Sequence, residues 1–332
     1  MSPFDRRGFL RAGAAGLAAI PLTRLDEIAS PWTHTPGARK SRVALVRTSD
    51  RKDGVARAVK LLDPRGIDGK RVMLKPNFNT ADAAPGSTHN DTLAQIVREL
   101  QARGARSVTL GESSGPPRTS GVMQRKGIPD LARDVGFEIV DYETIPDGDW
   151  VAFKPAGTHW PEGFWLPRQV VQADYNVSTC CLKTHGYGGV FTMSLKLSVG
   201  LTPKRIRRTM HGSPDMRRMI AELNGGYRPS LVLLDGVDAF TDGGPSNGTL
   251  AHANVILAGD DRVAIDAVGL AILKELGAND AIMSRPIFQQ EQIARAVELK
   301  LGATGPGAIE LVTWDTDSAE FAGRIRKILD QA

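Results

Sequence analysis

The feature that most constrains the fold of this chain is a regular alternation between β-prone runs and segments with helical spacing of apolar residues. The first strands are predicted at residues 42–48, 71–75, 107–110 and 137–141, and helices between them at 54–62, 92–103 and 128–135. Strands that alternate with helices in this way are typical of a parallel sheet covered by helices. We therefore predict an α/β fold: a mostly parallel, doubly wound sheet with helices on both faces.

The alternation is interrupted once, at residues 147–172. This segment contains Trp150, Trp160 and Trp165 together with several prolines. Proline is poorly tolerated inside helices and central strands. We interpret the segment as a small irregular or β-rich insertion that could act as a flap.

The alternation then resumes and continues to the end of the chain. Strands are predicted at 175–182, 231–235, 254–258 and 309–313, and helices at 189–199, 215–223, 262–276, 286–301 and 318–330. A loop with a run of cations is predicted between the first two of these helices. Asp91 and Asp261 precede helical segments and are predicted to be helix caps.

Bulk composition excludes several classes of protein. The chain has 332 residues, of which 41% are hydrophobic and 24% charged, and its net charge is +5. No apolar run reaches the length of a membrane-spanning helix. The positive charge is too weak and too dispersed to indicate a nucleic-acid partner. The two cysteines, Cys180 and Cys181, are adjacent on a predicted strand, so we expect both to be buried and no iron–sulfur cluster to be bound by this chain.

The N-terminal segment has the pattern of an export signal. Arg6 and Arg7 are followed by Phe9 and Leu10 and by a short, mildly apolar run at 12–22. This combination resembles a twin-arginine signal. It predicts the twin-arginine export machinery as a partner and a periplasmic or otherwise exported location, with an uncleaved signal anchor as a further option. The alternative is a chance basic N-terminus before an amphipathic helix.

The domain organisation follows from this signal. Residues 1–38 are predicted to be signal and linker. Residues 39–332 are predicted to form the α/β domain, with 147–172 as an insertion.

Polar side chains gather after several predicted strands. Lys75 and Asn77 follow one strand, Glu112 follows the next, and Lys183 and His185 follow the strand at 175–182. The carboxyl ends of parallel strands share one edge of a sheet, where open α/β folds bind their ligands. We therefore predict a site at this edge.

The chemistry of these residues suggests their roles. Burial lowers the pKa of a lysine and makes it available as a base or nucleophile. We therefore predict catalytic roles for Lys183, His185 and Lys75, although a lysine at a strand end can also be purely structural. A small anionic ligand would be held by a wider set: Asn77, His89, Glu112, Ser113, Lys196, Arg205 and His211.

More than one role is open for three further residues, Lys196, Asp235 and Asp266. Lys196 lies among apolar residues, where a side chain that snorkels to solvent is the alternative. Asp235 and Asp266 follow predicted strands and could orient the cations or bind a metal ion. The cofactor is otherwise left open.

Five separated motifs together resemble the DUF362 family, a domain of unknown function. They are Lys75-Pro76-Asn77, Gly111-Glu112-Ser113, Lys183-Thr184-His185 with Lys196 and Gly200, Asp235-Gly236 through Gly244-Pro245, and Ala258-Gly259-Asp260 with 263–267. The resemblance spans roughly residues 42–280 and implies an α/β domain and little else. Some members are joined to ferredoxin-like iron–sulfur modules, which this sequence lacks.

Three functional hypotheses follow. The first is an exported enzyme that acts on a small anionic substrate through a Lys/His/Asp site. The second is a non-catalytic binding protein for an anion, a metal ion or a metallocofactor of the kind that nickel-dependent racemases use. The third is a docking protein whose partner contacts the tryptophans of the insertion.

Overall fold

The computed structural model describes residues 40–331. The predicted signal and nearly all of the predicted linker lie outside these residues. None of the helices in the described part of the chain is long and apolar enough to cross a membrane.

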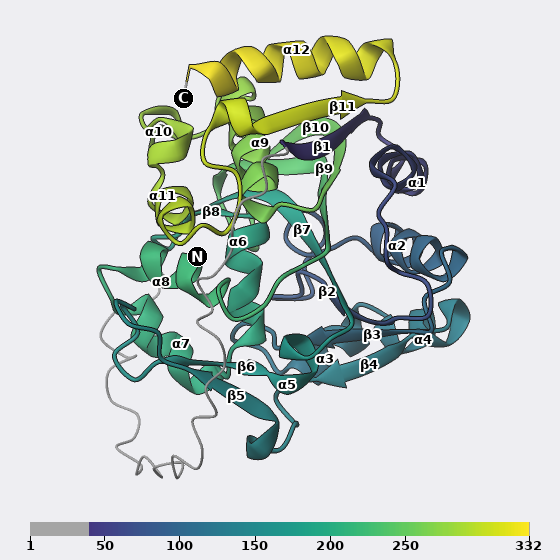
Figure 1. The fold of residues 1–332 in the computed structure, drawn as a ribbon, viewed down its shortest axis with the longest axis vertical. Helices are drawn as coiled ribbons and strands as arrows, with labels where there is room; N and C mark the ends of the chain where they lie inside the picture. Colours follow the sequence, from purple (N-terminus) through teal and green to yellow (C-terminus); the bar gives the residue numbers. More distant parts are fainter. Residues whose placement is uncertain (1–39, 332) are drawn as a thin grey trace, which may run out of the picture.

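One large sheet organises the fold (Figure 1). From edge to edge its strands are β11 (Ile309–Thr313), β1 (Ser41–Arg47), β10 (Gly248–Gly259), β9 (Leu231–Gly243), β7 (Tyr175–His185), β2 (Arg71–Lys75), β3 (Ser107–Glu112) and β4 (Glu138–Asp141). All neighbouring pairs are parallel except those that β10 forms with β1 and β9. A short strand, β8 (Val190–Thr192), adds antiparallel to the end of β7. The prediction of a mostly parallel α/β sheet is confirmed.

Helices cover both faces of the sheet. The α-helices are α1 (Arg51–Leu62), α2 (Asn90–Ala102), α3 (Thr119–Arg125), α4 (Ile128–Val135), α5 (Arg168–Val171), α6 (Ser194–Leu197), α7 (Lys204–His211), α8 (Met216–Leu223), α9 (Arg262–Glu275), α10 (Asp280–Met283), α11 (Glu291–Glu298) and α12 (Thr316–Asp330). The short 3-10 helices are η2 (Asp147–Asp149), η3 (Ser198–Leu201), η4 (Ile287–Gln289) and η5 (Pro306–Ala308).

The two faces bury separate hydrophobic cores. Leu233 on β9 packs in a core with Val55 of α1 and Ile96 of α2. Its neighbour Leu234 packs in a second core with Val268 of α9. Successive side chains of a strand point to opposite faces, so each strand supplies both cores. This explains why the central strands read as continuous apolar runs.

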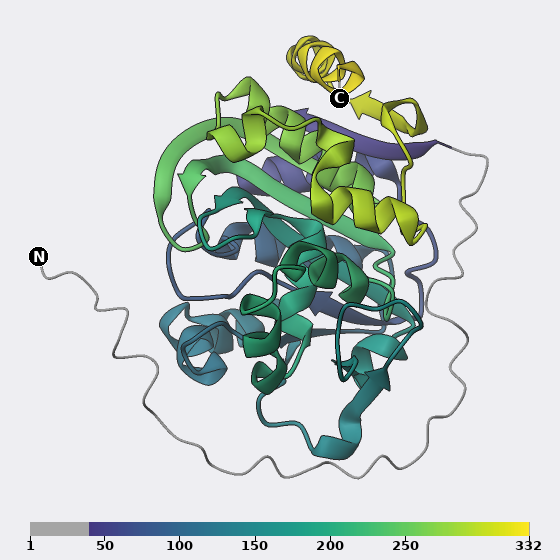
Figure 2. The ribbon, with the colours of Figure 1, turned by 90° about the vertical axis from the view of Figure 1, so that its left-hand side faces the viewer.

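The insertion at 147–172 forms a second, two-stranded antiparallel sheet of β5 (Trp150–Phe153) and β6 (Phe164–Pro167). It lies at the opposite end of the molecule from β11 and α12 (Figure 2). Trp160 is only 1% exposed, and its indole N–H donates to the Met219 carbonyl of α8 at 3.0 Å. Trp160 therefore belongs to a third core and is not available to a partner.

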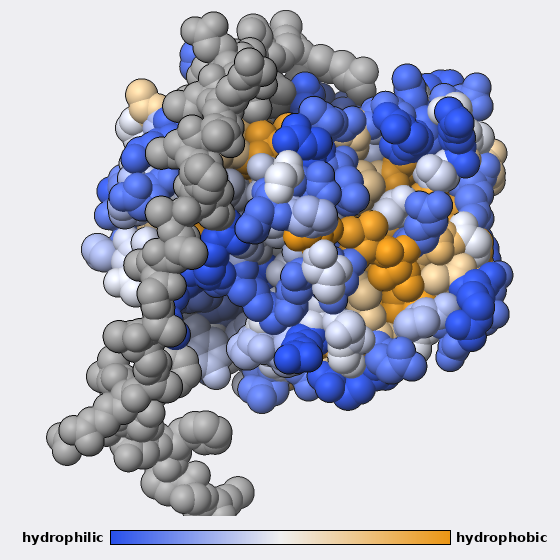
Figure 3. Space-filling model, turned by 90° about the horizontal axis from the view of Figure 1, so that it is seen from below, coloured by the Kyte–Doolittle hydropathy of each residue, from blue (hydrophilic) through white to orange (hydrophobic). Residues whose placement is uncertain are grey.

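The surface at this end of the molecule is mostly hydrophilic. Figure 3 shows it from below: polar side chains surround several apolar areas, of which the largest lies to the right of the centre of the view. Among the described residues the large, clearly exposed apolar side chains are Tyr187, Leu250, Met283 and Trp314. They come from four different segments, and single exposed apolar residues of this kind are ordinary for a protein surface.

Three local predictions were wrong. The helix predicted at 189–199 begins instead as β8, because these residues pair with the end of β7. The cationic segment predicted as a loop is helix α7. α2 begins at Asn90 with His89 as its cap, so Asp91 lies in the first turn. Asp261 does cap α9, through hydrogen bonds from two backbone amides.

The antiparallel pair of β9 and β10 places Asp235 and the residues after β10 differently from the prediction. The predicted strand at 231–235 continues to Gly243, so Asp235 lies in mid-strand and not at its end. β10 runs antiparallel to β9. The segment that follows β10 therefore begins where β2, β3 and β7 start, and not where these three strands finish.

Candidate functional site

A cavity of about 840 Å³ lies at the carboxyl ends of β2, β3, β7 and β9. Its walls are the segments that follow these strands, together with β8, α6, η3 and α7. Predicted site residues that line it are Lys75, Asn77, Glu112, Ser113, His185, Lys196 and His211. A second hollow of about 780 Å³ lies between β11 and α12 and contains none of them.

Lys75 forms a buried ion pair with Glu112. The Lys75 Nζ atom lies 2.7 Å from the Glu112 carboxylate and donates also to the Pro76 carbonyl at 2.5 Å. Glu112 accepts two further hydrogen bonds, from the backbone amides of Phe78 and Ser113, each at 2.9 Å. Burial lowers the pKa of Lys75, while the Glu112 charge opposes that shift. The pair is held in place by the loops that follow β2 and β3.

Lys183 joins three segments of the chain. Its Nζ atom donates to the Asn77 side chain at 3.2 Å and to the carbonyls of Gly86 and Pro245 at 2.7 and 2.8 Å. The side chain is fully buried, and this burial lowers its pKa to about 8. An ammonium group has three donors, so the protein itself already provides an acceptor for each of them.

His185 is a neutral hydrogen-bond donor. Its Nδ1 atom accepts from the backbone amides of Tyr187 and Gly189, each at 3.2 Å. These two bonds assign the ring hydrogen to Nε2. Burial, together with nearby cations such as Lys196, lowers the pKa of His185 to about 2. The imidazole therefore carries no charge near neutral pH.

Lys196 differs from the other lysines of the site. It is 8% exposed and lines the cavity, and its amine has no hydrogen bond or ion pair to any residue within 40–331. Burial lowers its pKa to about 7, and the charges of Lys183 and Arg207 contribute to this shift. The Thr192 hydroxyl, also in the cavity wall, is buried without a hydrogen-bond partner.

Asp266 holds the start of α6, the helix that carries Lys196. Its carboxylate accepts from the backbone amides of Ser194 and Leu195, at 2.7 and 2.9 Å, at the start of α6. These amides would otherwise have no partner, because the first amides of a helix lack intrahelical acceptors. Burial raises the pKa of Asp266 to about 7. Asp266 therefore acts on the helix that carries Lys196 and does not line the cavity.

Arg207 is a cavity residue that sequence analysis did not select. Its guanidinium donates to the carbonyls of Ser113, Ser114 and Thr202 at 3.0, 2.5 and 2.6 Å, and to the Ser113 hydroxyl at 2.6 Å. These acceptors are neutral, and burial lowers the pKa of Arg207 to about 10. The run of cations at 204–208 was a signal for such a residue, but helix α7 decides which of them points inward.

The remaining cations of α7 lie nearer to solvent. Lys204 pairs with Glu143 at 2.8 Å. Arg208 and His211 are exposed where they line the cavity. Arg205 points elsewhere: its guanidinium lies 5.7 Å from the centre of the Trp165 ring, and it does not line the cavity.

His89 and Asp235 also lie outside the cavity wall. His89 caps α2 by accepting the Asp91 amide at 3.1 Å. Asp235 pairs with Arg51 of α1 at 2.9 Å and accepts from the Thr92 hydroxyl of α2 at 2.6 Å. Both of its contacts serve the packing of helices on the sheet.

The predicted metal ligands, Asp235 and Asp266, therefore lie apart and have other partners. Across residues 40–331, no group of three or more His, Cys, Asp or Glu side chains is arranged to hold a metal ion.

Comparison with known proteins places the chain in context. The family model described as "Domain of unknown function (DUF362)" matches residues 72–271. The thylakoid-associated protein sll1697 of Synechocystis sp. is 26% identical over 248 residues, which cover 70% of this chain and 74% of that protein. The lactate racemase apoprotein from Thermoanaerobacterium thermosaccharolyticum aligns over 85% of each chain with 13% identity and a TM-score of 0.44. Neither likeness assigns a role to a residue of the cavity.

Proposed function

This chain belongs to the DUF362 family, and we propose that it binds a small anion in the cavity and acts on it as an enzyme, with Lys196 and His185 facing the ligand. The observation that carries this proposal is the amine of Lys196, which lies in a buried wall and has no partner among residues 40–331. A buried charge without a partner is costly, and protein interiors retain such groups mainly where they serve a site.

The charge balance of the cavity supports an anionic ligand. Its described wall contains one acidic side chain, Glu112, which is already paired with Lys75. Within the described part of the chain, Lys196 has no partner, and the hydrogen bonds of Arg207 go to neutral oxygens. A carboxylate or phosphate group would supply the missing negative charge.

Proton transfer is the chemistry that this wall can offer. A general acid or base works best when its pKa lies near the pH of operation, and the pKa of Lys196 is about 7. Neutral His185 can donate a hydrogen bond to an oxygen of the ligand through Nε2. Lys75 and Lys183 are not needed for this step, because both hold the loops through their contacts with protein acceptors.

The alternative is binding without conversion of the ligand. Both Lys75 and Lys183, which the sequence suggested as catalytic groups, are occupied by protein acceptors. That arrangement favours a preformed binding site in which the same Lys196 and Arg207 hold the anion. One observation distinguishes the two functions: an enzyme releases a chemically changed ligand, and a binding protein releases the ligand unchanged.

Anion binding is tested by calorimetric titration of the purified protein with inorganic phosphate and with malonate. We expect affinity to fall as the pH rises through about 7, because Lys196 then loses its proton. Lys196→Met is expected to weaken binding at pH 6 by about tenfold or more, which corresponds to about 1.4 kcal/mol.

Lys327→Met is the matched control, since it removes one positive charge from the exposed surface of α12. Its affinity should stay close to that of the wild type. If the wild type binds neither anion at pH 6, or if Lys196→Met binds both as tightly as the wild type, the proposed site is wrong.

Export by the twin-arginine route is a second part of the proposal, and it rests on the sequence of residues 1–38 alone. We expect a fusion of these residues to a folded reporter to be exported, because that route accepts folded cargo. Replacing both Arg6 and Arg7 with lysine keeps the charge and should leave the reporter in the cytoplasm. Cell fractionation measures where the reporter is found. If the doubly substituted fusion is exported as well as the unchanged one, the twin-arginine assignment is wrong.

A further inference from the structure

We propose that Lys196 is a nucleophile that forms an imine with a small anion carrying a carbonyl group, such as a 2-oxo carboxylate. This inference rests on the proposed function, because it specifies the class of ligand for the same cavity. It goes further by assigning a covalent step to one atom, the Nζ of Lys196.

Hydrogen bonding distinguishes Lys196 from the other lysines around the cavity. An amine attacks a carbonyl only when its lone pair is free. Lys75 is held by Glu112, and Lys183 donates to three protein oxygens. Lys204 pairs with Glu143 and donates to the Pro117 carbonyl at 2.6 Å. Within residues 40–331, the amine of Lys196 has no such contact although it lines the cavity.

The surroundings of Lys196 favour its neutral form. Two apolar residues that follow it closely in the chain, Leu197 and Val199, line the same cavity and are themselves almost fully buried. Desolvation together with nearby cations is the combination that activates nucleophilic lysines. The pKa of about 7 leaves a substantial fraction of the amine unprotonated at neutral pH.

His185 lies beside Lys196, and Thr192 lines the same cavity. A Cβ atom added to Gly189 would lie 2.9 Å from both His185 Nδ1 and Lys196 Cε, so the two side chains flank the same glycine. The His185 Nε2–H and the unpartnered Thr192 hydroxyl can each donate to a carbonyl oxygen. Lys204, Arg207 and Arg208 of α7 line the same cavity and supply positive charge for the carboxylate of the ligand.

The step balances without an oxidant or a reductant. The nitrogen lone pair forms a bond to the carbonyl carbon, and the carbonyl electrons move to the oxygen, which takes up a proton. The oxygen then leaves as water. In the overall balance, the two hydrogens of this water are the two that the amine nitrogen has lost. A carbon–nitrogen double bond to Lys196 remains, and water reverses the reaction.

The test is reductive trapping of the full-length protein with pyruvate as the probe and cyanoborohydride as the reductant. We expect the mass of one reduced pyruvate unit on the protein, and peptide mapping should place it on Lys196. Lys204 in the same molecule is the internal control and should remain unmodified. An adduct spread equally over Lys204 and surface lysines, or none at Lys196, would overturn the proposal.

Two comparisons separate this inference from the proposed function. Lys196→Arg keeps the positive charge, so it should still bind malonate while it loses the adduct. Trapping by the wild type should increase from pH 6 to pH 8, opposite to anion binding, because it needs the neutral amine. Malonate binding without trapping would leave the anion site standing and remove the imine.

Acetone tests whether the ligand must be an anion. It has the same carbonyl group as pyruvate but no carboxylate. We expect it to be trapped at Lys196 at least about tenfold more slowly than pyruvate, which is the effect of losing one favourable charge contact. Equal trapping of the two compounds would overturn the anionic part of the proposal.

Discussion

Replacing Lys196 with methionine is expected to raise the free energy of unfolding by about 2 kcal/mol at pH 7, although the residue lies in the proposed site. The wild-type protein buries an amine that has no partner among the described residues. Methionine has a similar length and needs no solvation. A substitution that stabilises the protein and weakens its ligand binding is what we expect at a residue that serves function at a cost in stability.

The stabilisation expected from Lys196→Met depends on pH, because the cost of burying Lys196 depends on its protonation. The pKa of Lys196 falls from an ordinary value of 10.5 to about 7 in the folded protein. Between these two values the unfolded chain binds more protons than the folded chain, so wild-type stability rises with pH across this window. The gain from methionine should therefore be full below about pH 7 and should shrink towards pH 10.

Urea unfolding at pH 6, 7 and 9, in a buffer without phosphate, measures this gain. Lys327→Met should change the stability by no more than about 0.5 kcal/mol, as surface substitutions usually do. A given concentration of phosphate should stabilise the wild type more than Lys196→Met, because the stabilisation grows with the affinity of the folded state for the ligand. A Lys196→Met protein that is less stable than the wild type at every pH would show that the amine supports the fold.

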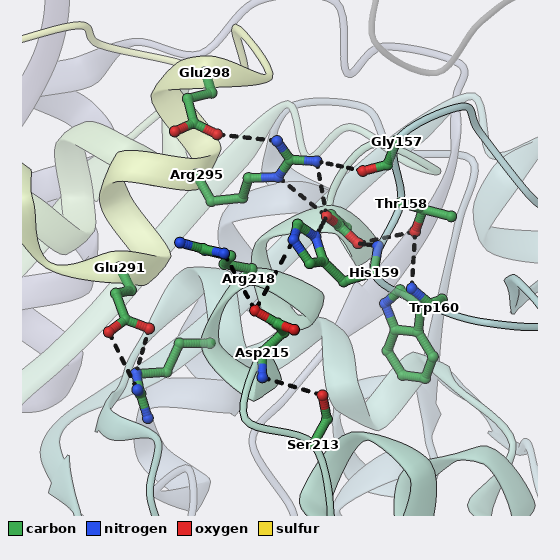
Figure 4. Close-up of polar contacts among 12 residues, drawn as sticks. Gly157, Thr158, His159, Trp160, Ser213, Asp215, Arg218, Glu291, Arg295 and Glu298 are labelled. Carbon is green, nitrogen blue, oxygen red and sulfur yellow. Dashed lines mark hydrogen bonds and ion pairs between the residues drawn. The ribbon is translucent and has the colours of Figure 1, made fainter.

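Replacing Glu222 with alanine is expected to lower the free energy of unfolding by about 3 kcal/mol. The carboxylate is fully buried in α8 and contacts Arg295 of α11 at 2.9 Å. It also accepts from the Thr158 hydroxyl and the His159 amide, each at 2.9 Å, and contacts His159 Nδ1 at 2.6 Å. Figure 4 shows these groups converging from the insertion and from two helices.

The cost is large because several partners lose their acceptor together. Without Glu222, Arg295 retains the exposed Glu298 as its carboxylate partner, at 2.9 Å. The half-buried Thr158 hydroxyl and His159 amide of the insertion would lose their acceptor, and polar groups that are shielded from water are expensive when left unsatisfied. The insertion would then be held to α8 mainly by its apolar core.

Glu298→Ala is the matched control, because it removes another carboxylate partner of the same arginine. Glu298 is 62% exposed and lies one helical turn from Arg295, so its loss should cost no more than about 0.5 kcal/mol. Urea unfolding of both variants measures the difference. Equal losses for the two variants would mean that the buried network contributes no more than a surface ion pair.

Several features of the protein were determined by local sequence. Periodicity located the strands and helices of the sheet, because a half-buried helix and a buried strand each impose a spacing on apolar residues. The polar groups after β2, β3 and β7 were also visible, since the end of an apolar run marks the end of a strand. These signals were enough to predict the fold class and to place Lys75, Glu112 and His185 near one edge.

Only the tertiary structure decided which of these groups have partners. Lys75, Lys183 and Lys196 look alike in the sequence, yet Glu112 pairs with the first and three loop oxygens surround the second. Lys196 has no such partner in the range that the structure describes. Asp266 likewise accepts from the backbone amides of Ser194 and Leu195 and does not line the cavity. Burial and ion pairing depend on residues distant in the chain, so no local pattern records them.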